Sequence, residues 1–269
     1  MNEIQKTGAD QVPAHLLQLM QQGTVSTGVE SMKHIRILNR VAVIQSNSPK
    51  EKKDKFGEGA ICVPASDMTL ARQGQQIDFV PVLFFEEFIA WNDRKDKSGA
   101  MIYDRTTDRE SDLAKRCQDP KRWFEYYGPT DVPDDKKLKR SFRHHLNFLA
   151  VIYSGPLKGE LVVFSFAKSN WRVGAGMISK IRQRKIQGLQ APMWSTVFSC
   201  RTVHVTNDGN EWYKFDVNNA EVPWVEASDM EAMKLMHEEL TASYKASEFS
   251  VGHEAAEGVE STGEADDEM

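Results

Sequence analysis

Cysteine is scarce in this sequence of 269 residues: Cys62, Cys117 and Cys200 are far apart and odd in number. A disulfide framework is therefore not expected, and this usage fits a reducing cytoplasm. No stretch approaches the roughly 18 apolar residues that a membrane span needs. The first ten residues are polar and show no apolar signal region, so nothing in them indicates export.

Signatures of catalysis and of bound metal are missing as well. Gly174 and Gly176 form a Gly-x-Gly pair without a third glycine in register, and no Lys-Ser or Lys-Thr follows, so a nucleotide-binding loop is not supported. No Cys-x-x-Cys pair is present for a zinc ribbon. His144 and His145 are adjacent, so in a strand their side chains would point to opposite faces. We expect no catalytic residues, no metal and no cofactor.

Charge of either sign is unevenly distributed, although the formal net charge is only −5. Residues 248–269 contain eight acidic residues and no Lys or Arg, which leaves residues 1–247 at about +3, with 34 basic against 31 acidic residues. Residues 136–214 contain 14 Lys or Arg and three acids, a local net charge of +11. Such segregation predicts a polyanionic partner, because a basic surface concentrates polyanions around itself.

The hydrophobic pattern predicts a β-rich α+β fold. Alternating or β-branched runs indicate strands near residues 34–45, 60–63, 77–85, 148–153, 160–166, 196–206 and 211–217, and a basic helix over 174–186. Pro81 favours an edge strand or a bulge. Ser228-x-x-Glu231 is a capping-box pattern that would open an amphipathic helix. We therefore expect four segments: a flexible N-terminal arm (1–30), a nucleic-acid-binding domain (31–225, with a charge-dense insertion at 92–141), an amphipathic helix (226–247) and a disordered acidic tail (248–269).

The basic residues of this domain are the candidate phosphate contacts, since cations release condensed counterions when they bind phosphates. The alternative is a solvated face, which one such run would favour. Fourteen bases against three acids favour a polyanion instead. The candidates are Lys136, Lys137, Lys139, Arg140, Arg143, Lys168, Arg172, Lys180, Arg182, Arg184, Lys185 and Arg201.

Aromatic residues beside these cations favour single-stranded over duplex nucleic acid, because unstacked bases stack on flat rings for about 1–3 kcal/mol each. Trp194 and Trp212 are better explained as core. The candidate stacking residues are Trp123, Phe124, Tyr126, Tyr127 and Trp171.

Several stretches together resemble bacteriophage-type single-stranded DNA-binding proteins over about three quarters of the chain. They are residues 41–49 before the Gly57-Glu-Gly59 turn, 79–82 with Trp91, Phe164-Ser-Phe-Ala-Lys-Ser-Asn-Trp171, 191–194, the closing hairpin and the acidic C-terminus. The resemblance implies an OB-like barrel that coats single strands during replication, recombination and repair, in the host cytoplasm. It also implies that the tail recruits replication or recombination proteins.

The tail residues Glu264, Asp266, Asp267 and Glu268 are candidates for partner binding or for autoinhibition of the basic surface. The chain ends in Met269, whereas tails of this kind often end in an aromatic residue. Two other functions stay open: a phage-type nuclease or recombination accessory enzyme using the same groove, and an assembly protein with a basic protein-binding face. RNA as the ligand and a homo-oligomeric state also stay open.

Overall fold

Two long antiparallel strands, β5 (Ile77–Trp91) and β8 (Leu138–Ile152), organise the fold. The computed structural model describes residues 36–93, 95–96, 101–133, 136–155, 157–207, 209–247 and 249–252. β5 is dense in phenylalanine, isoleucine and valine, which suit a pleated and buried surface. The two strands pair from Phe79 opposite Ile152 to Trp91 opposite Ser141.

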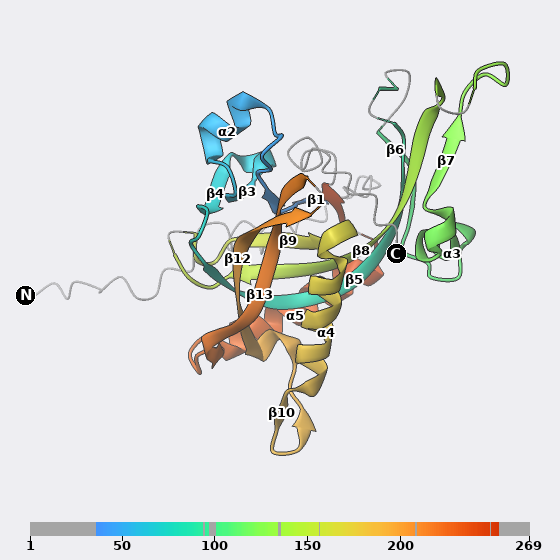
Figure 1. Cartoon of the computed structure of the whole chain (residues 1–269). Coiled ribbons are helices and arrows are strands. Elements are labelled where there is room, and N and C mark those ends of the chain that lie inside the picture. The colour runs from blue at the N-terminus through green and yellow to red at the C-terminus, as the bar shows by residue number, and fades with distance from the viewer. Residues whose placement is uncertain are drawn as a thin grey trace, which may run out of the picture.

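Five further strands complete the main sheet, whose path is β13–β12–β5–β8–β7, with β6 on β5 and β9 on β8. β12 and β9 flank one half of the β5–β8 pair, and β6 and β7 flank the other half. The first half curls into a half-barrel and the second projects from it (Figure 1). The added strands are β6 (Ile102–Thr106), β7 (Phe124–Tyr127), β9 (Leu161–Phe166), β12 (Thr196–Asn207) and β13 (Asn210–Trp224).

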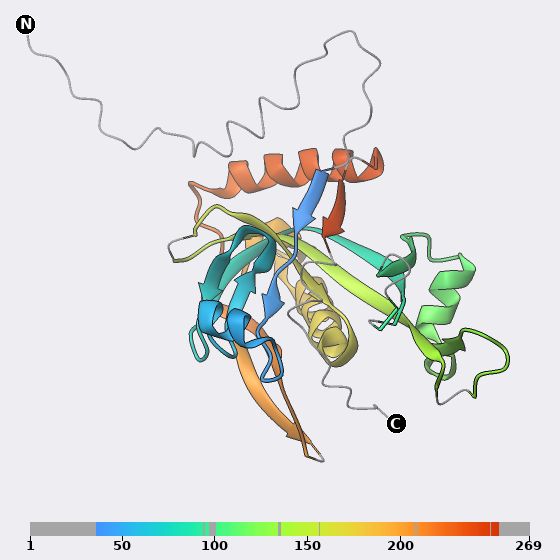
Figure 2. The ribbon, with the colours of Figure 1, turned by 90° about the horizontal axis from the view of Figure 1, so that it is seen from above.

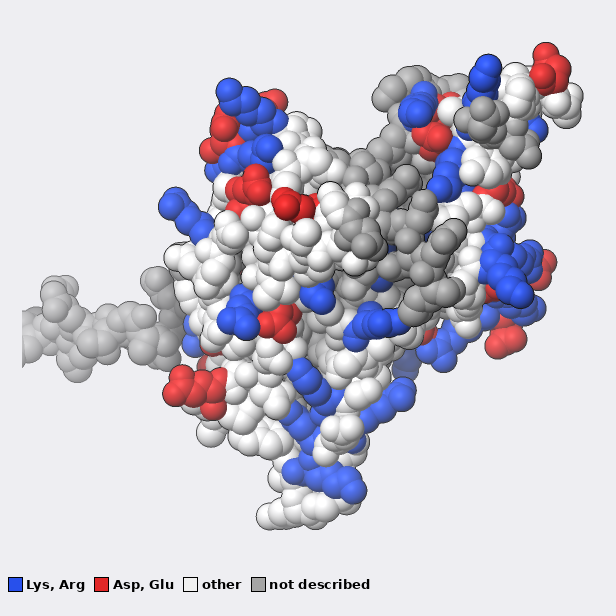
Figure 3. All heavy atoms as spheres, viewed as in Figure 1, with Lys and Arg blue, Asp and Glu red and all other residues white. Residues whose placement is uncertain are grey.

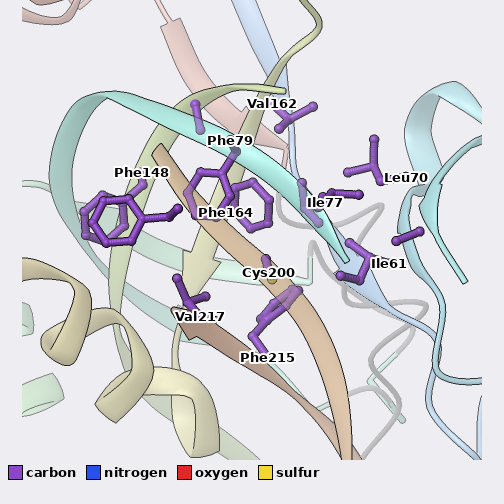
Figure 4. Packing of buried hydrophobic residues seen from close by; sticks show 14 of the residues in the cluster. Ile61, Leu70, Ile77, Phe79, Phe148, Val162, Phe164, Cys200, Phe215 and Val217 are labelled. Carbon is purple, nitrogen blue, oxygen red and sulfur yellow. The ribbon is translucent and has the colours of Figure 1, made fainter. Parts of the chain in front are cut away.

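The concave side of the half-barrel holds an aromatic core. Phe79, Phe148, Phe164 and Phe215 point into it from four different strands (Figure 4). Phe79 and Phe164 stack with ring centroids 4.4 Å apart, and aromatic pairs of this kind add stability beyond their buried area. The curl is thus fixed by large rings that fill its interior.

A small antiparallel sheet spans the open side of the half-barrel. It consists of β2 (Ala42–Val43), β3 (Ile61–Val63) and β4 (Met68–Ala71), and the helix α2 (Lys50–Phe56) connects β2 to β3. The Val41 amide donates to the Val163 carbonyl of β9 at 2.8 Å. The Gln45 side chain pairs with β13 as the backbone of a neighbouring strand would. It donates to the Tyr213 carbonyl and accepts from the Tyr213 amide. The segment from Val41 to Gln45 therefore joins β9 to β13.

Two helices cover opposite sides of the sheet (Figure 2). α4 (Trp171–Gln183) packs on the aromatic core through Met177 and neighbouring apolar residues. α5 (Met230–Lys245) packs on the outer face through Met233, Leu240 and Tyr244. Beside α5, strands β1 (Arg36–Asn39) and β14 (Phe249–Gly252) pair in parallel.

The projecting half of the sheet forms what we call the side lobe: β6, α3 (Asp112–Gln118), the 3₁₀ turn Pro120–Arg122, β7 and the adjoining ends of β5 and β8. α3 begins at Ser111, whose hydroxyl accepts a hydrogen bond from the Ala114 amide, and packs Ala114 and Cys117 on Phe88 and Phe142. The remaining elements are the 3₁₀ turns Pro64–Ser66, Lys168–Asn170 and Met193–Ser195 and the short strands β10 (Lys185–Ile186) and β11 (Leu189–Gln190).

The β-rich α+β class and the C-terminal helix are confirmed, and several details are corrected. β5 is a central strand, and Pro81 lies at a break in its register with β8, so of the two predicted settings for Pro81 the bulge is found. The predicted strand at 34–45 divides into β1 and β2. The capping box is wrong: α5 begins after Asp229 without a side-chain cap.

Strand β14 also contradicts the prediction of disorder for the part of the tail at 249–252, because Val251 is buried in the outer core. The predicted N-terminal arm and the tail candidates Glu264, Asp266, Asp267 and Glu268 lie outside the described residues. Within the described part of the chain, no helix is both long and apolar enough to cross a membrane.

Candidate nucleic-acid interface

One face of the side lobe alternates aromatic rings and cations. On β7, Phe124 and Tyr126 are two residues apart, so their side chains share a face. Tyr126 lies directly opposite Lys139 of β8, and the Lys139 ammonium lies 3.8 Å from the centre of the Phe124 ring. The Arg143 guanidinium lies 4.5 Å from that ring. Tyr126 remains 53% exposed. We call these four residues the β7–β8 face.

The opposite face of the same strands is tied together internally. Arg140 forms an ion pair with Glu125 at 2.7 Å and donates to the Asn92 side chain at 3.1 Å. Its guanidinium stacks 3.3 Å from the ring centre of Tyr103 and 4.6 Å from that of Tyr127. Of the predicted site residues, Arg140 and Tyr127 thus hold the lobe together.

The hydroxyl of Tyr127 donates to the Asp96 carboxylate at 2.8 Å. Burial, followed by the Asp96 contact, raises the pKa of Tyr127 above its ordinary value. The indole N–H of Trp123 donates to the Cys117 carbonyl at 2.8 Å and so links β7 to α3. Burial also raises the pKa of the Cys117 thiol to about 11, which keeps it protonated and unreactive at neutral pH.

Trp171, at the start of α4, is positioned by a relay that reaches into the lobe. Its indole N–H donates to His144 Nδ1 at 3.2 Å, so the neutral imidazole carries its proton on Nε2. His144 Nε2 lies 3.0 Å from a Glu86 carboxylate oxygen, and Glu86 also pairs with Arg109. Burial lowers the pKa of His144, although Glu86 opposes the shift. Trp171 is therefore held in one orientation while part of its ring stays exposed.

The cations on and beside α4 divide into two groups. Lys180 donates to the Val217 carbonyl at 2.8 Å, and Arg184 donates to the Pro223 carbonyl at 2.8 Å and to Asn219 at 2.6 Å. Both satisfy acceptors along the outer edge of β13, which ends the sheet path. The side chains of the other group are exposed: Lys168, Arg172, Arg182 and Lys185.

Arg201 is placed apart from both groups. It forms an ion pair with Asp216 at 2.9 Å and lines a hollow of about 310 Å³ together with Asp216 and Glu221. Carboxylates in such a hollow disfavour phosphate. Of the last two predicted cations, Lys136 is exposed and Lys137 is partly buried just before β8.

The predicted residues thus form two surfaces rather than one cluster. The first is the β7–β8 face, and the second runs along α4, from Trp171 beside His144 down to the β10 hairpin (Figure 1). Residues 161–207, which include all of α4, contain seven Lys or Arg and no Asp or Glu. Figure 3 shows blue side chains running down this part of the molecule to the hairpin.

Comparison with known proteins gives a family. A family of phage proteins, described as Pam3 phage gp34-like proteins, matches residues 5–246. The chain belongs to this family. No curated protein and no solved structure matches it. The family establishes a bacteriophage protein and states no activity.

Two exposed features of this phage protein are not predicted from its sequence. Tyr103 on β6 is 58% exposed, and Ile186 and Leu189 project from the hairpin β10–β11. The Gln187-Gly188 pair between them was a turn signal that could have revealed the hairpin. In the described part of the chain, no group of three or more His, Cys, Asp or Glu side chains is arranged to hold a metal ion.

Proposed function

We propose that this phage protein binds single-stranded DNA without strong sequence preference and coats it during replication, recombination or repair. The observation that carries the proposal is the β7–β8 face, where Phe124 and the exposed Tyr126 lie beside Lys139 and Arg143. Single strands need stacking surfaces and phosphate contacts side by side, and this face offers both.

The chemistry of binding follows from the two kinds of group. Bases stack on the rings of Tyr126 and Phe124, while Lys139 and Arg143 neutralise the neighbouring phosphates. Every base has a flat face, so stacking tolerates any sequence. The rings stand on paired strands, so little conformational entropy is lost when the DNA binds.

The exposed cations on and beside α4 supply a second basic surface on the other side of the sheet, because α4 packs on the side that holds His144 and Phe148. Lys168, Arg172 and Arg182 flank the helix, and Trp171 adds an aromatic ring at its start. Gly176 lies between them, and a methyl group there would meet no atom within 4 Å. Packing does not require this glycine, and its small size allows a nucleic-acid backbone to approach the helix closely.

The curled sheet and the segment that joins β9 to β13 support the expected OB-like barrel as the framework of this activity. In the proposed function the acidic tail remains the segment that competes with DNA for the basic surface and recruits replication or recombination proteins. No catalytic step and no cofactor belong to the proposal.

The test is fluorescence-anisotropy titration of a labelled oligo-dT with the wild type and two variants. Tyr126→Ala removes a stacking ring, so the dissociation constant should rise about 5- to 100-fold. Tyr103→Ala is the matched control, because Tyr103 is equally exposed but lies with Arg140 on the other side of the lobe. It should bind within about twofold of the wild type, since no base stacks there.

The outcomes separate the alternatives. No oligo-dT binding by the wild type at low salt would overturn the proposal and favour the assembly protein with a basic face. Binding followed by magnesium-dependent loss of the oligonucleotide would favour the nuclease. Equal weakening by both tyrosine variants would mean that the loss is not specific to the β7–β8 face, and would overturn stacking there.

A further inference from the structure

A short β-hairpin projects from the end of α4, away from the body of the protein (Figure 1). Its strands β10 and β11 pair Lys185 with Gln190 and Ile186 with Leu189. Gln187 and Gly188 connect them with φ angles of 52° and 82°. Two consecutive positive φ values define a type I′ turn, the tight connection that matches the twist of paired strands.

The base of the hairpin is firmly attached. The Gln190 side chain donates to the Ile181 carbonyl at 2.7 Å, and the Ala191 amide donates to the Arg184 carbonyl at 3.0 Å. Arg184 in turn donates to the Pro223 carbonyl of β13. A two-stranded hairpin alone is marginal in water, so these contacts hold the hairpin in a defined direction.

The tip of the hairpin is apolar and uncovered. Ile186 is 45% exposed and Leu189 is 76% exposed. The two residues lie directly opposite each other in the hairpin register. This apolar pair stands on a projecting element, where it is free to insert into a partner.

The charges around the tip identify the class of partner. Lys185, Arg182 and Arg184 surround the base of the hairpin, and no acidic residue occurs between residues 161 and 207. Figure 3 shows blue side chains above an uncharged tip at the lower end of the molecule. A second copy of the chain would bring the same cations against these, whereas a nucleic acid would be attracted.

We propose that the hairpin is a wedge that inserts Ile186 and Leu189 at the junction between single-stranded and duplex DNA and separates the terminal base pair. In other DNA-binding proteins, inserted isoleucine and leucine side chains partly unstack neighbouring base pairs of a duplex. The proposal rests on the proposed single-strand binding, and it adds a strand-separating activity to it.

An aromatic ring on which a separated base can stack lies beside the hairpin. Trp224 of β13 is 37% exposed, and the Arg184 guanidinium lies 5.6 Å from its ring centre. An aromatic ring next to a cation is the arrangement that binds an unpaired nucleotide. In this proposal the hairpin separates the terminal base pair, and one of the two separated bases stacks on Trp224.

The experiment uses a forked duplex with a single-stranded oligo-dT arm and 2-aminopurine at the first base pair of the duplex. The wild type should raise 2-aminopurine fluorescence on binding, because unstacking the base relieves quenching. The double variant Ile186→Ser/Leu189→Ser should bind oligo-dT within about twofold of the wild type but lose roughly four fifths of that rise, because polar side chains do not wedge between bases.

Leu235→Ser is the matched control, because Leu235 of α5 is an apolar residue that is 49% exposed and lies outside the hairpin and β13. It should open the junction like the wild type. The wedge proposal is overturned if the double variant keeps the fluorescence rise, or if the wild type binds oligo-dT but gives no rise. Either result leaves the proposed single-strand binding intact. Failure of the wild type to bind oligo-dT would overturn the proposed function itself.

Discussion

Glu87 lies buried in the middle of β5, under the outer face of the sheet. Asn147 donates to its carboxylate at 2.7 Å, and Arg105 and Arg40 supply nearby positive charge. Burial outweighs these three favourable contacts and raises the pKa of Glu87 to about 7. Between pH 4.5 and about 7, the Glu87 carboxyl group is therefore mostly protonated in the folded protein and mostly ionised in the unfolded chain.

This carboxyl group makes the free energy of unfolding depend on pH. Its folded pKa of about 7 exceeds the ordinary value of 4.5, so the folded state binds more protons between these limits and stability falls as pH rises through them. The loss should approach about 3 kcal/mol by pH 8. Urea denaturation at about pH 5 and about pH 8 measures it.

Glu87→Gln should reduce this pH dependence by most of that amount, because the amide cannot titrate. Glu110→Gln, at an exposed position of the lobe, is the control and should leave the dependence unchanged. An unaltered pH dependence in Glu87→Gln would show that another group titrates in this range.

Neighbouring residues can have opposite roles, and the tyrosines of β7 show why sequence alone does not separate them. Tyr126 faces solvent on the β7–β8 face, whereas Tyr127 hydrogen-bonds Asp96 within the lobe. Strand alternation predicts that the two differ, but which one faces out depends on the register with Lys139 and Leu138. That register is set by contacts between distant parts of the chain.

Among the secondary-structure elements, α4 contains two glycines in different surroundings, one in the packed core and one in open space. An added methyl at Gly174 would lie 2.8 Å from Phe166 Cβ and 3.1 Å from Leu146 Cδ1, inside the packed core. At Gly176 it would meet nothing within 4 Å. The first glycine permits the helix to approach β9, and packing gives no reason for the second.

Gly174→Ala should therefore destabilise the protein by about 1–3 kcal/mol through overpacking. Gly176→Ala should be neutral or stabilise it by up to about 1 kcal/mol, because alanine favours helix more than glycine does. Equilibrium urea denaturation compares the two variants. A Gly176→Ala protein as unstable as Gly174→Ala would mean that the described packing of α4 is wrong.

Most strands could be located from the sequence, but the lengths of the two central ones could not. The apolar run 148–153 marks only the end of β8, which starts at Leu138. The preceding residues Lys139, Arg140 and Arg143 are polar enough to suggest a loop. They are held in a strand because β5 and β7 supply partners from elsewhere in the chain.

Across the whole molecule, the sequence located the basic region but overestimated the charge it offers to a ligand. Arg140, Lys180, Arg184 and Arg201 bind acceptors within the protein. One nitrogen of Arg143 also donates to the Phe142 carbonyl at 2.9 Å. Counting charges along the sequence cannot distinguish cations that bind acceptors within the protein from cations that face solvent. A smaller set of cations is left for a ligand: the partly exposed Lys139 and Arg143 of the lobe, and the exposed cations on and beside α4.

The number of these cations sets the expected salt dependence of binding. About four to six cations on Lys139, Arg143 and the exposed part of α4 should contact phosphates. For single strands the logarithm of the association constant falls by about 0.7 per phosphate contact for each tenfold rise in salt. The expected slope is therefore about −3 to −4.

The most direct measurement is the affinity of the intact protein for oligo-dT at several salt concentrations, with duplex DNA of the same length as competitor. We expect tight binding at low salt, a slope of about −3 to −4 and poor competition by duplex. Binding of single strands is contradicted if the protein does not bind oligo-dT at low salt, or if duplex competes as well as single strand.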